Sequence, residues 1–126
     1  MNRENGACGV FAILVGAFLL IEGVWGLSSP VVFGVLATNL LHAVIHIALG
    51  AIGIWVGLKS GARKYCLFLG GLLVAVGALW FVPVVGPIIT SLLNVNAAVA
   101  YLNLVVGAVA LVLAFTARPE QPQSRT

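Results

Sequence analysis

Charge is what this sequence lacks most. Asp, Glu, Lys and Arg make up only 7% of its 126 residues, whereas apolar residue types make up 62% and the mean hydropathy is +1.18. A soluble domain normally carries about a quarter of its residues as charged side chains. The scarcity of charge therefore excludes a soluble fold and predicts a protein whose outer surface contacts the lipid bilayer.

Catalytic and cofactor motifs are also absent. The two cysteines, Cys8 and Cys66, form neither a CxxC pair nor a zinc set with the two histidines, so we expect free thiols. The sequence has no phosphate-binding loop, zincin helix, nucleophile elbow or Ser-His-Asp set. We therefore expect no cofactor, no nucleic-acid partner and no enzyme, and a membrane-embedded enzyme that uses Glu22 and His46 stays as the alternative.

Four apolar stretches are long enough to cross a membrane, which takes about 20 residues for roughly 30 Å of hydrocarbon. They cover residues 7–27, 36–58, 65–82 and 97–117. The first follows a short polar segment, as in a signal peptide, but it is longer than a secretory apolar region and lacks a small-x-small cleavage site. The prediction is an all-α membrane protein with four transmembrane helices.

The positions of the basic residues predict the orientation. With four crossings, all six cations fall on one side, and short basic loops stay in the cytoplasm. The three loop cations are too few to suggest a dedicated site for anionic lipid. We expect a cytoplasmic N-terminal tail (1–6), a first transmembrane hairpin (7–58), a basic cytoplasmic loop (59–64), a second hairpin (65–117) and a disordered cytoplasmic tail (118–126). The cations are Arg3, Lys59, Arg63, Lys64, Arg118 and Arg125.

The two predicted hairpins resemble each other in sequence. Residues 39–50 align with 96–107 at a constant offset, since 96 − 39, 103 − 46 and 107 − 50 all equal 57. Helices one and three align through Gly16 with Gly70 and Gly23 with Gly77, at an offset of 54. Because each half crosses the membrane twice, the halves are predicted to be parallel repeats related by an axis along the membrane normal.

Glycine recurs at intervals of seven residues within the predicted helices. In membranes, helices associate where small residues let backbones approach closely. We therefore predict tight helix pairs, within the chain or between copies. The glycines expected at these contacts are Gly9, Gly16, Gly23, Gly50, Gly57, Gly70, Gly77 and Gly107.

Polar side chains inside the predicted spans form one cluster. Asn39, His42 and His46 share one face of the second helix, and Glu22 of the first helix lies at a similar depth, roughly 8 Å from the end without charge. In the second repeat, Asn96 and Asn103 are the polar counterparts, whereas Val99 replaces His42 and no acidic residue matches Glu22. Any ionisable site therefore belongs to the first hairpin.

Three interpretations of this cluster remain open. Glu22 and a histidine form a structural hydrogen bond between helices, or the same groups carry protons or bind an ion, since intramembrane ionisable residues are often functional. Alternatively, Glu22, His42 and His46 are weak candidates for metal ligands. The two histidines leave the helix on the same side, so they cannot be the two axial ligands of one haem.

The repeated segments carry a family resemblance: an Asn before the helix, a His one to two turns in, and a Gly one turn later, with Asn103 in place of the His in the second segment. With Asn39, His42, His46 and Gly50, then Asn96, Asn103 and Gly107, the chain resembles an uncharacterised bacterial family of small four-helix membrane proteins, a domain of unknown function. Family members tend to carry an acidic residue and His in the second copy too. The resemblance implies the same architecture, the bacterial inner membrane, and no known activity.

The function expected from these observations is helix packing, as a homo-oligomer or as an accessory subunit of a larger membrane complex. The alternative is a proton- or cation-coupled transporter or channel that uses Glu22 with His42 and His46.

Overall fold

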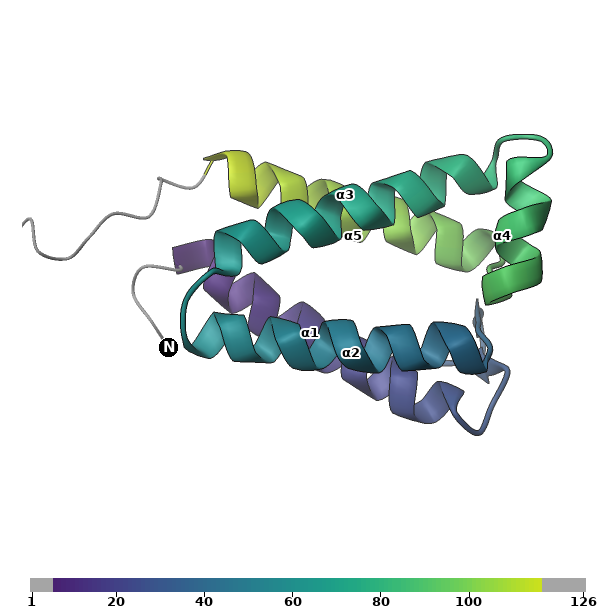
Figure 1. The fold of residues 1–126 in the computed structure, drawn as a ribbon, viewed down its shortest axis with the longest axis horizontal. Helices are drawn as coiled ribbons and strands as arrows, with labels where there is room; N and C mark the ends of the chain where they lie inside the picture. Colours follow the sequence, from purple (N-terminus) through teal and green to yellow (C-terminus); the bar gives the residue numbers. More distant parts are fainter. Residues whose placement is uncertain (1–5, 117–126) are drawn as a thin grey trace, which may run out of the picture.

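The computed structural model describes residues 6–116, and this part of the chain forms five helices and two short strands (Figure 1). Residues 1–5 of the predicted N-terminal tail and all of the predicted tail 118–126 lie outside the described residues. The elements are α1 (Gly6–Gly26), β1 (Val31–Val32), β2 (Leu36–Ala37), α2 (Leu40–Leu58), α3 (Ala62–Trp80), α4 (Val85–Leu93) and α5 (Ala97–Thr116).

The prediction of an all-α membrane protein with four spanning helices is confirmed. Helices α1, α2, α3 and α5 have 21, 19, 19 and 20 residues and are apolar enough to cross a membrane. Large apolar side chains such as Leu14, Trp55, Phe68 and Val105 stand exposed on them, as expected for lipid-facing positions.

Two helices begin three or more residues away from their predicted first residues. The second helix begins at Leu40 because Asn39 caps it, and Leu36 belongs to β2. The third begins at Ala62, so half of the predicted basic loop is helical. Apolar composition alone does not reveal where a helix begins, since capping decides it.

The helices pack closely in two pairs, α1 with α2 and α3 with α5, and the pairs lie over each other (Figure 1). A Cβ atom added to Gly16 would lie 2.7 Å from the carbonyl oxygen of Gly50, and one added to Gly50 would lie 2.5 Å from that of Gly16. Gly70 and Gly107 meet in the same reciprocal way, at 2.9 Å each. Only glycine fits at these backbone contacts, which occupy corresponding positions in the two sequence repeats.

The remaining predicted packing glycines also lie in these two interfaces. Gly23 faces the backbone of Ala43, and Gly57 faces the carbonyl of Gly9, both between α1 and α2. Gly77 faces the carbonyl of Ala100 between α3 and α5.

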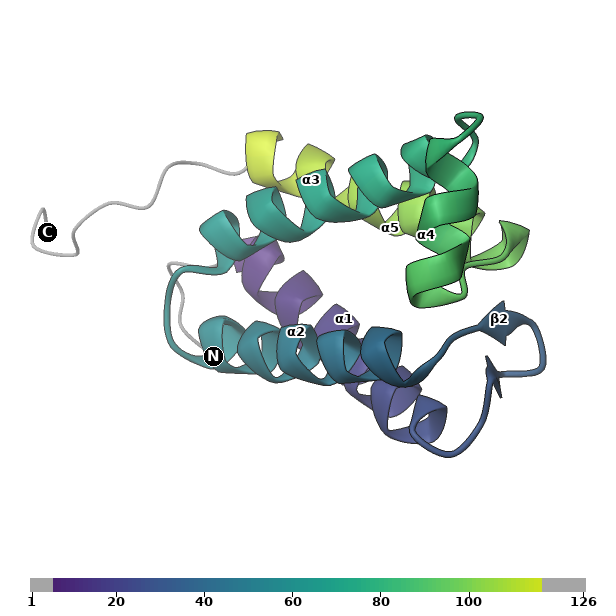
Figure 2. The same cartoon turned by 45° about the vertical axis from the view of Figure 1, so that its right-hand side comes forward.

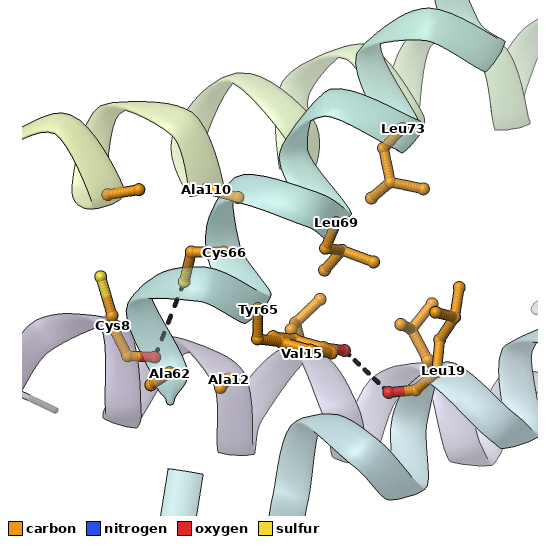
Figure 3. Packing of buried hydrophobic residues seen from close by; sticks show 12 residues of the cluster. Cys8, Ala12, Val15, Leu19, Ala62, Tyr65, Cys66, Leu69, Leu73 and Ala110 are labelled. Carbon is orange, nitrogen blue, oxygen red and sulfur yellow. Dashed lines mark hydrogen bonds between the residues drawn. The ribbon is translucent and has the colours of Figure 1, made fainter. Parts of the chain in front are cut away.

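The main hydrophobic core joins the two helix pairs near the basic end, the end that carries the α2–α3 connection (Figure 3). Cys8, Ala12 and Val15 of α1 pack against Cys66 and Leu69 of α3. The hydroxyl of Tyr65 crosses from α3 to α2 and donates a hydrogen bond to the carbonyl of Leu49, at 2.8 Å. Both cysteines are free thiols in this core.

The opposite end, which we call the uncharged end, consists of residues 27–39 and 81–96. Its connections have structure of their own (Figure 2): β1 and β2 form a small antiparallel hairpin, and α4 is a short helix beside it. Val32 and Leu36 of the hairpin pack with Val95 and Val99 in a second, smaller core. This end therefore closes over the helices and positions the polar cluster beneath it.

Candidate polar site near the uncharged end

Asn39 and Asn96 hold the two halves of the chain together in the same way. Each side-chain oxygen accepts a hydrogen bond from the backbone N–H of the third residue onward, His42 at 2.9 Å and Val99 at 3.0 Å, which caps its own helix. Each side-chain nitrogen donates across to the other half, Asn39 to the carbonyl of Leu92 at 2.9 Å and Asn96 to that of Val35 at 3.0 Å. The repeated asparagines are thus capping and cross-linking residues.

Glu22 and His46 meet between α1 and α2. The Oε1 atom of Glu22 lies 3.1 Å from Nδ1 of His46, and the two residues are only 6% and 8% exposed. Gly23, next to Glu22, allows the helices to approach closely at this level. A carboxyl group buried in a spanning helix is costly unless it is paired, so this contact explains how Glu22 is tolerated there.

His42 links this pair to the uncharged end. Its ring lies against that of His46, with centroids 4.3 Å apart and planes at 69°. Its Nδ1 atom lies 3.0 Å from the carbonyl oxygen of Leu93, at the end of α4. Because a carbonyl only accepts, Nδ1 of His42 carries the proton and donates it. Side-chain contacts therefore run from α1 through the two stacked histidines of α2 to the end of α4.

Two cavities adjoin the histidines. The first, of about 10 Å³, is lined by Glu22, His42 and His46 together with residues of the β1–β2 hairpin. That is room for a single water molecule. The second, of about 90 Å³, lies between the helix pairs and is mostly apolar. Its lining residues are His42, Ile45, His46, Leu49, Leu72, Leu73, Val76, Leu93 and Asn103.

Asn103 is the polar residue that the second repeat contributes to the site. It is the counterpart of His46, is 7% exposed, and lines the larger cavity opposite the histidines. Within residues 6–116, no hydrogen bond of its side chain is found, and the amide faces the cavity. Of the predicted polar residues, Glu22, His42, His46 and Asn103 thus gather around the cavities, whereas Asn39 and Asn96 lie above them as helix caps.

The metal interpretation gains no support from this geometry. Among the described residues, no three His, Cys, Asp or Glu side chains come close enough together to hold a metal ion. Nδ1 of His42 is used by the carbonyl of Leu93, and Nδ1 of His46 is used by Glu22.

A comparison with protein families assigns this chain to one of them. A family model described as a domain of unknown function (DUF4383) matches residues 9–116, which include nearly all of the four spanning helices. The chain belongs to this family. No curated protein and no solved structure matches the chain. The predicted resemblance to an uncharacterised family is confirmed, and the DUF4383 family assigns no activity to the site.

Sequence reasoning missed two features of this DUF4383 member. Asn94 donates to the carbonyl of Thr38 at 2.7 Å and adds a further bond between the halves. Gly71, in the middle of α3, has nothing within 4 Å of an added Cβ, unlike its neighbour Gly70. The Gly70-Gly71 doublet was the available signal, because one helix face cannot contain both glycines.

Proposed function

We propose that this protein acts through lateral packing of its helices against another membrane-embedded chain, as a homo-oligomer or as an accessory subunit. The main observation behind this proposal is the exposed position of Gly71. Glycine in the middle of a helix costs about 1 kcal/mol relative to Ala, and most glycines in the spanning helices offset that cost by close contacts within the chain. Gly71 makes no such contact, so its contact partner is expected outside the protomer.

The neighbours of Gly71 fit this proposal. Ala75 and Ala78 follow on the same face of α3, and all three residues are exposed. Small residues four apart form the small-xxx-small pattern that lets two membrane helices approach closely. Around them α3 presents bulky exposed side chains such as Phe68 and Leu79, which would surround a close contact at its centre.

The experiment combines one disruptive variant with a matched control. In Gly71→Leu the added side chain would separate the contacting helices, whereas Ala108→Leu adds the same bulk to an exposed position of α5. Mass measurement of the complex in mild detergent should show dissociation with Gly71→Leu and no change with Ala108→Leu. If Gly71→Leu leaves the assembly unchanged, or if the unaltered protein is a monomer, the proposal is wrong.

Cysteine cross-linking in the membrane identifies the kind of partner. Ala75→Cys places a thiol at the centre of the proposed contact, and the native cysteines are fully buried and do not compete. An oxidised product containing two copies of the chain supports a homo-oligomer. A product containing a different chain supports an accessory subunit.

Proton or cation coupling is the second candidate, and the Glu22–His46 contact favours it. The core between His46 and the basic end is evidence against this candidate. Its described side chains are apolar except for the two cysteines and Tyr65, and the hydroxyl of Tyr65 already donates to the carbonyl of Leu49. Proton flux into vesicles that is lost in Glu22→Gln would reverse this order of preference.

A further inference from the structure

The larger cavity has one polar end and an otherwise apolar wall. His42, His46 and Asn103 supply the polar side chains, and the rest of the lining is aliphatic. Its rim includes partly exposed residues of α2 and α3, such as Ile45 and Leu72, whereas Leu73 and Asn103 are buried. Because the partly exposed lining residues lie on two spanning helices, we infer that the cavity opens toward lipid between α2 and α3.

Water alone fits this cavity poorly. Since about 10–15 Å³ of such a volume holds one water molecule, about 90 Å³ has room for several, each of which needs two to four polar partners. Three polar side chains at one end can hold one or two, and the aliphatic remainder would stay unhydrated. An occupant with one polar group and a hydrocarbon body matches both parts of the wall.

The hydrogen-bonding groups at the polar end of the cavity are complementary to a hydroxyl group. His42 uses its Nδ1–H on the carbonyl of Leu93, so a neutral ring keeps only Nε2, which is an acceptor. The side-chain amide of Asn103, which has no hydrogen bond within residues 6–116 and lines the cavity, can both donate and accept. A hydroxyl group is complementary to both, because it donates one hydrogen bond and accepts another.

Depth and size restrict the occupant further. Asn103 and His46 each lie six residues into their helices from the uncharged end, roughly 9 Å at about 1.5 Å per residue. This places the polar end below the interface, within reach of a lipid hydroxyl but not of a charged headgroup. The volume is well below the roughly 150 Å³ of a cavity that encloses a benzene ring, which favours an unbranched chain.

We propose that the cavity between α2, α3 and α5 binds the hydroxyl end of a neutral, straight-chain membrane lipid, with Asn103 and His42 as the hydrogen-bonding residues. The site lies within one protomer, so its occupancy does not depend on lateral association. The chemistry is that of a long-chain alcohol, whose hydroxyl leaves the interface to bond the two side chains while its first carbons contact Leu49, Leu72 and Val76.

The test uses photolabelling of the full chain in phosphatidylcholine vesicles with a diazirine-bearing hexadecanol. Saturable labelling of α2 and α3 around Ile45 and Leu72 is expected, and unlabelled hexadecanol should compete while hexadecane should not. Asn103→Leu removes the amide at similar volume and should lower saturable labelling about fivefold, the usual effect of one hydrogen bond. Val105→Leu, on the exposed side of α5, should leave it unchanged.

A second variant keeps the test decisive if Asn103→Leu folds poorly. Leu72→Trp fills the mouth of the cavity from a partly exposed position and should abolish saturable labelling. Labelling that does not saturate, equal competition by hexadecane, or full labelling of both variants would overturn the proposal. Equal competition would identify the cavity as an apolar groove without hydroxyl recognition.

Discussion

At the scale of single residues, the polar side chains of this protein divide into those with a complete set of contacts and those without. Asn39 and Asn96 use both ends of their amide groups. Glu22 and His46 satisfy each other. Asn103 alone among the predicted polar residues has no described partner, which is why it, rather than Glu22, identifies the ligand site.

Substitution of Glu22 should separate a structural contact from an ionic one. Glu22→Gln keeps an oxygen acceptor for His46, so the melting temperature in detergent should change by no more than about 2 °C. Glu22→Leu removes the contact and should destabilise the protein by about 0.6–2 kcal/mol, the range for hydrogen bonds between membrane helices. The check is thermal unfolding followed by tryptophan fluorescence. An equal loss of thermal stability in both variants would mean that the charge of Glu22, and not its hydrogen bond, stabilises the site.

At the scale of elements, the protein consists of two helix pairs of matching construction. Each pair has a reciprocal glycine contact, Gly16 with Gly50 and Gly70 with Gly107, and each second helix begins with a capping Asn. The pairs differ in their connections, a β-hairpin in one and helix α4 in the other. The polar cluster forms where these unequal connections meet.

Variants of Asn39 should distinguish capping from cross-linking. Asn39→Asp keeps the oxygen that accepts from His42 but loses the nitrogen that donates to Leu92, so only the bond between the halves is removed. Asn39→Ala loses both and should cost about 1 kcal/mol more in unfolding free energy, the usual value of an N-cap. Denaturant titration in mixed micelles measures the difference.

Hydrogen exchange locates the effect of each Asn39 variant. Asn39→Asp should speed exchange in α4 and leave the first turn of α2 protected, whereas Asn39→Ala should expose both. Faster exchange in the first turn of α2 with Asn39→Asp would contradict this division of roles.

At the scale of the whole molecule, the two ends differ in charge and in the structure of their connections. The described cations, Lys59, Arg63 and Lys64, all lie at the basic end, where Arg63 donates to the carbonyl of Ala114 at 2.9 Å. One of the three loop cations is therefore engaged within the protein, which weakens the case for a lipid-headgroup site there. The uncharged end is closed by α4 and the β-hairpin.

Orientation is tested with introduced cysteines, because Cys8 and Cys66 are fully buried and would be protected from labelling on either side. Ser60 and Ser91 are exposed at opposite ends of the molecule. With an impermeant maleimide, Ser91→Cys should react from outside intact cells and Ser60→Cys only after permeabilisation, as the distribution of cations predicts. The reverse pattern would contradict cytoplasmic termini.

Composition and local sequence pattern by themselves determine the architecture of this protein. Four apolar stretches of spanning length predict four helices because lipid offers no hydrogen-bond partner to an exposed backbone. The constant offset between residues 39–50 and 96–107 predicts a duplicated segment, and Asn39 and Asn96 make corresponding hydrogen bonds in the structure.

Only the tertiary structure decided which polar groups contact each other and which glycine has no close contact within the described chain. The sequence places Glu22 and the histidines at one depth but does not fix the rotation of each helix, which depends on packing against its neighbours. That rotation pairs Glu22 with His46 and turns Asn103 into the cavity. It also buries Gly70 against α5 and leaves Gly71 facing outward, since adjacent residues of a helix point about 100° apart.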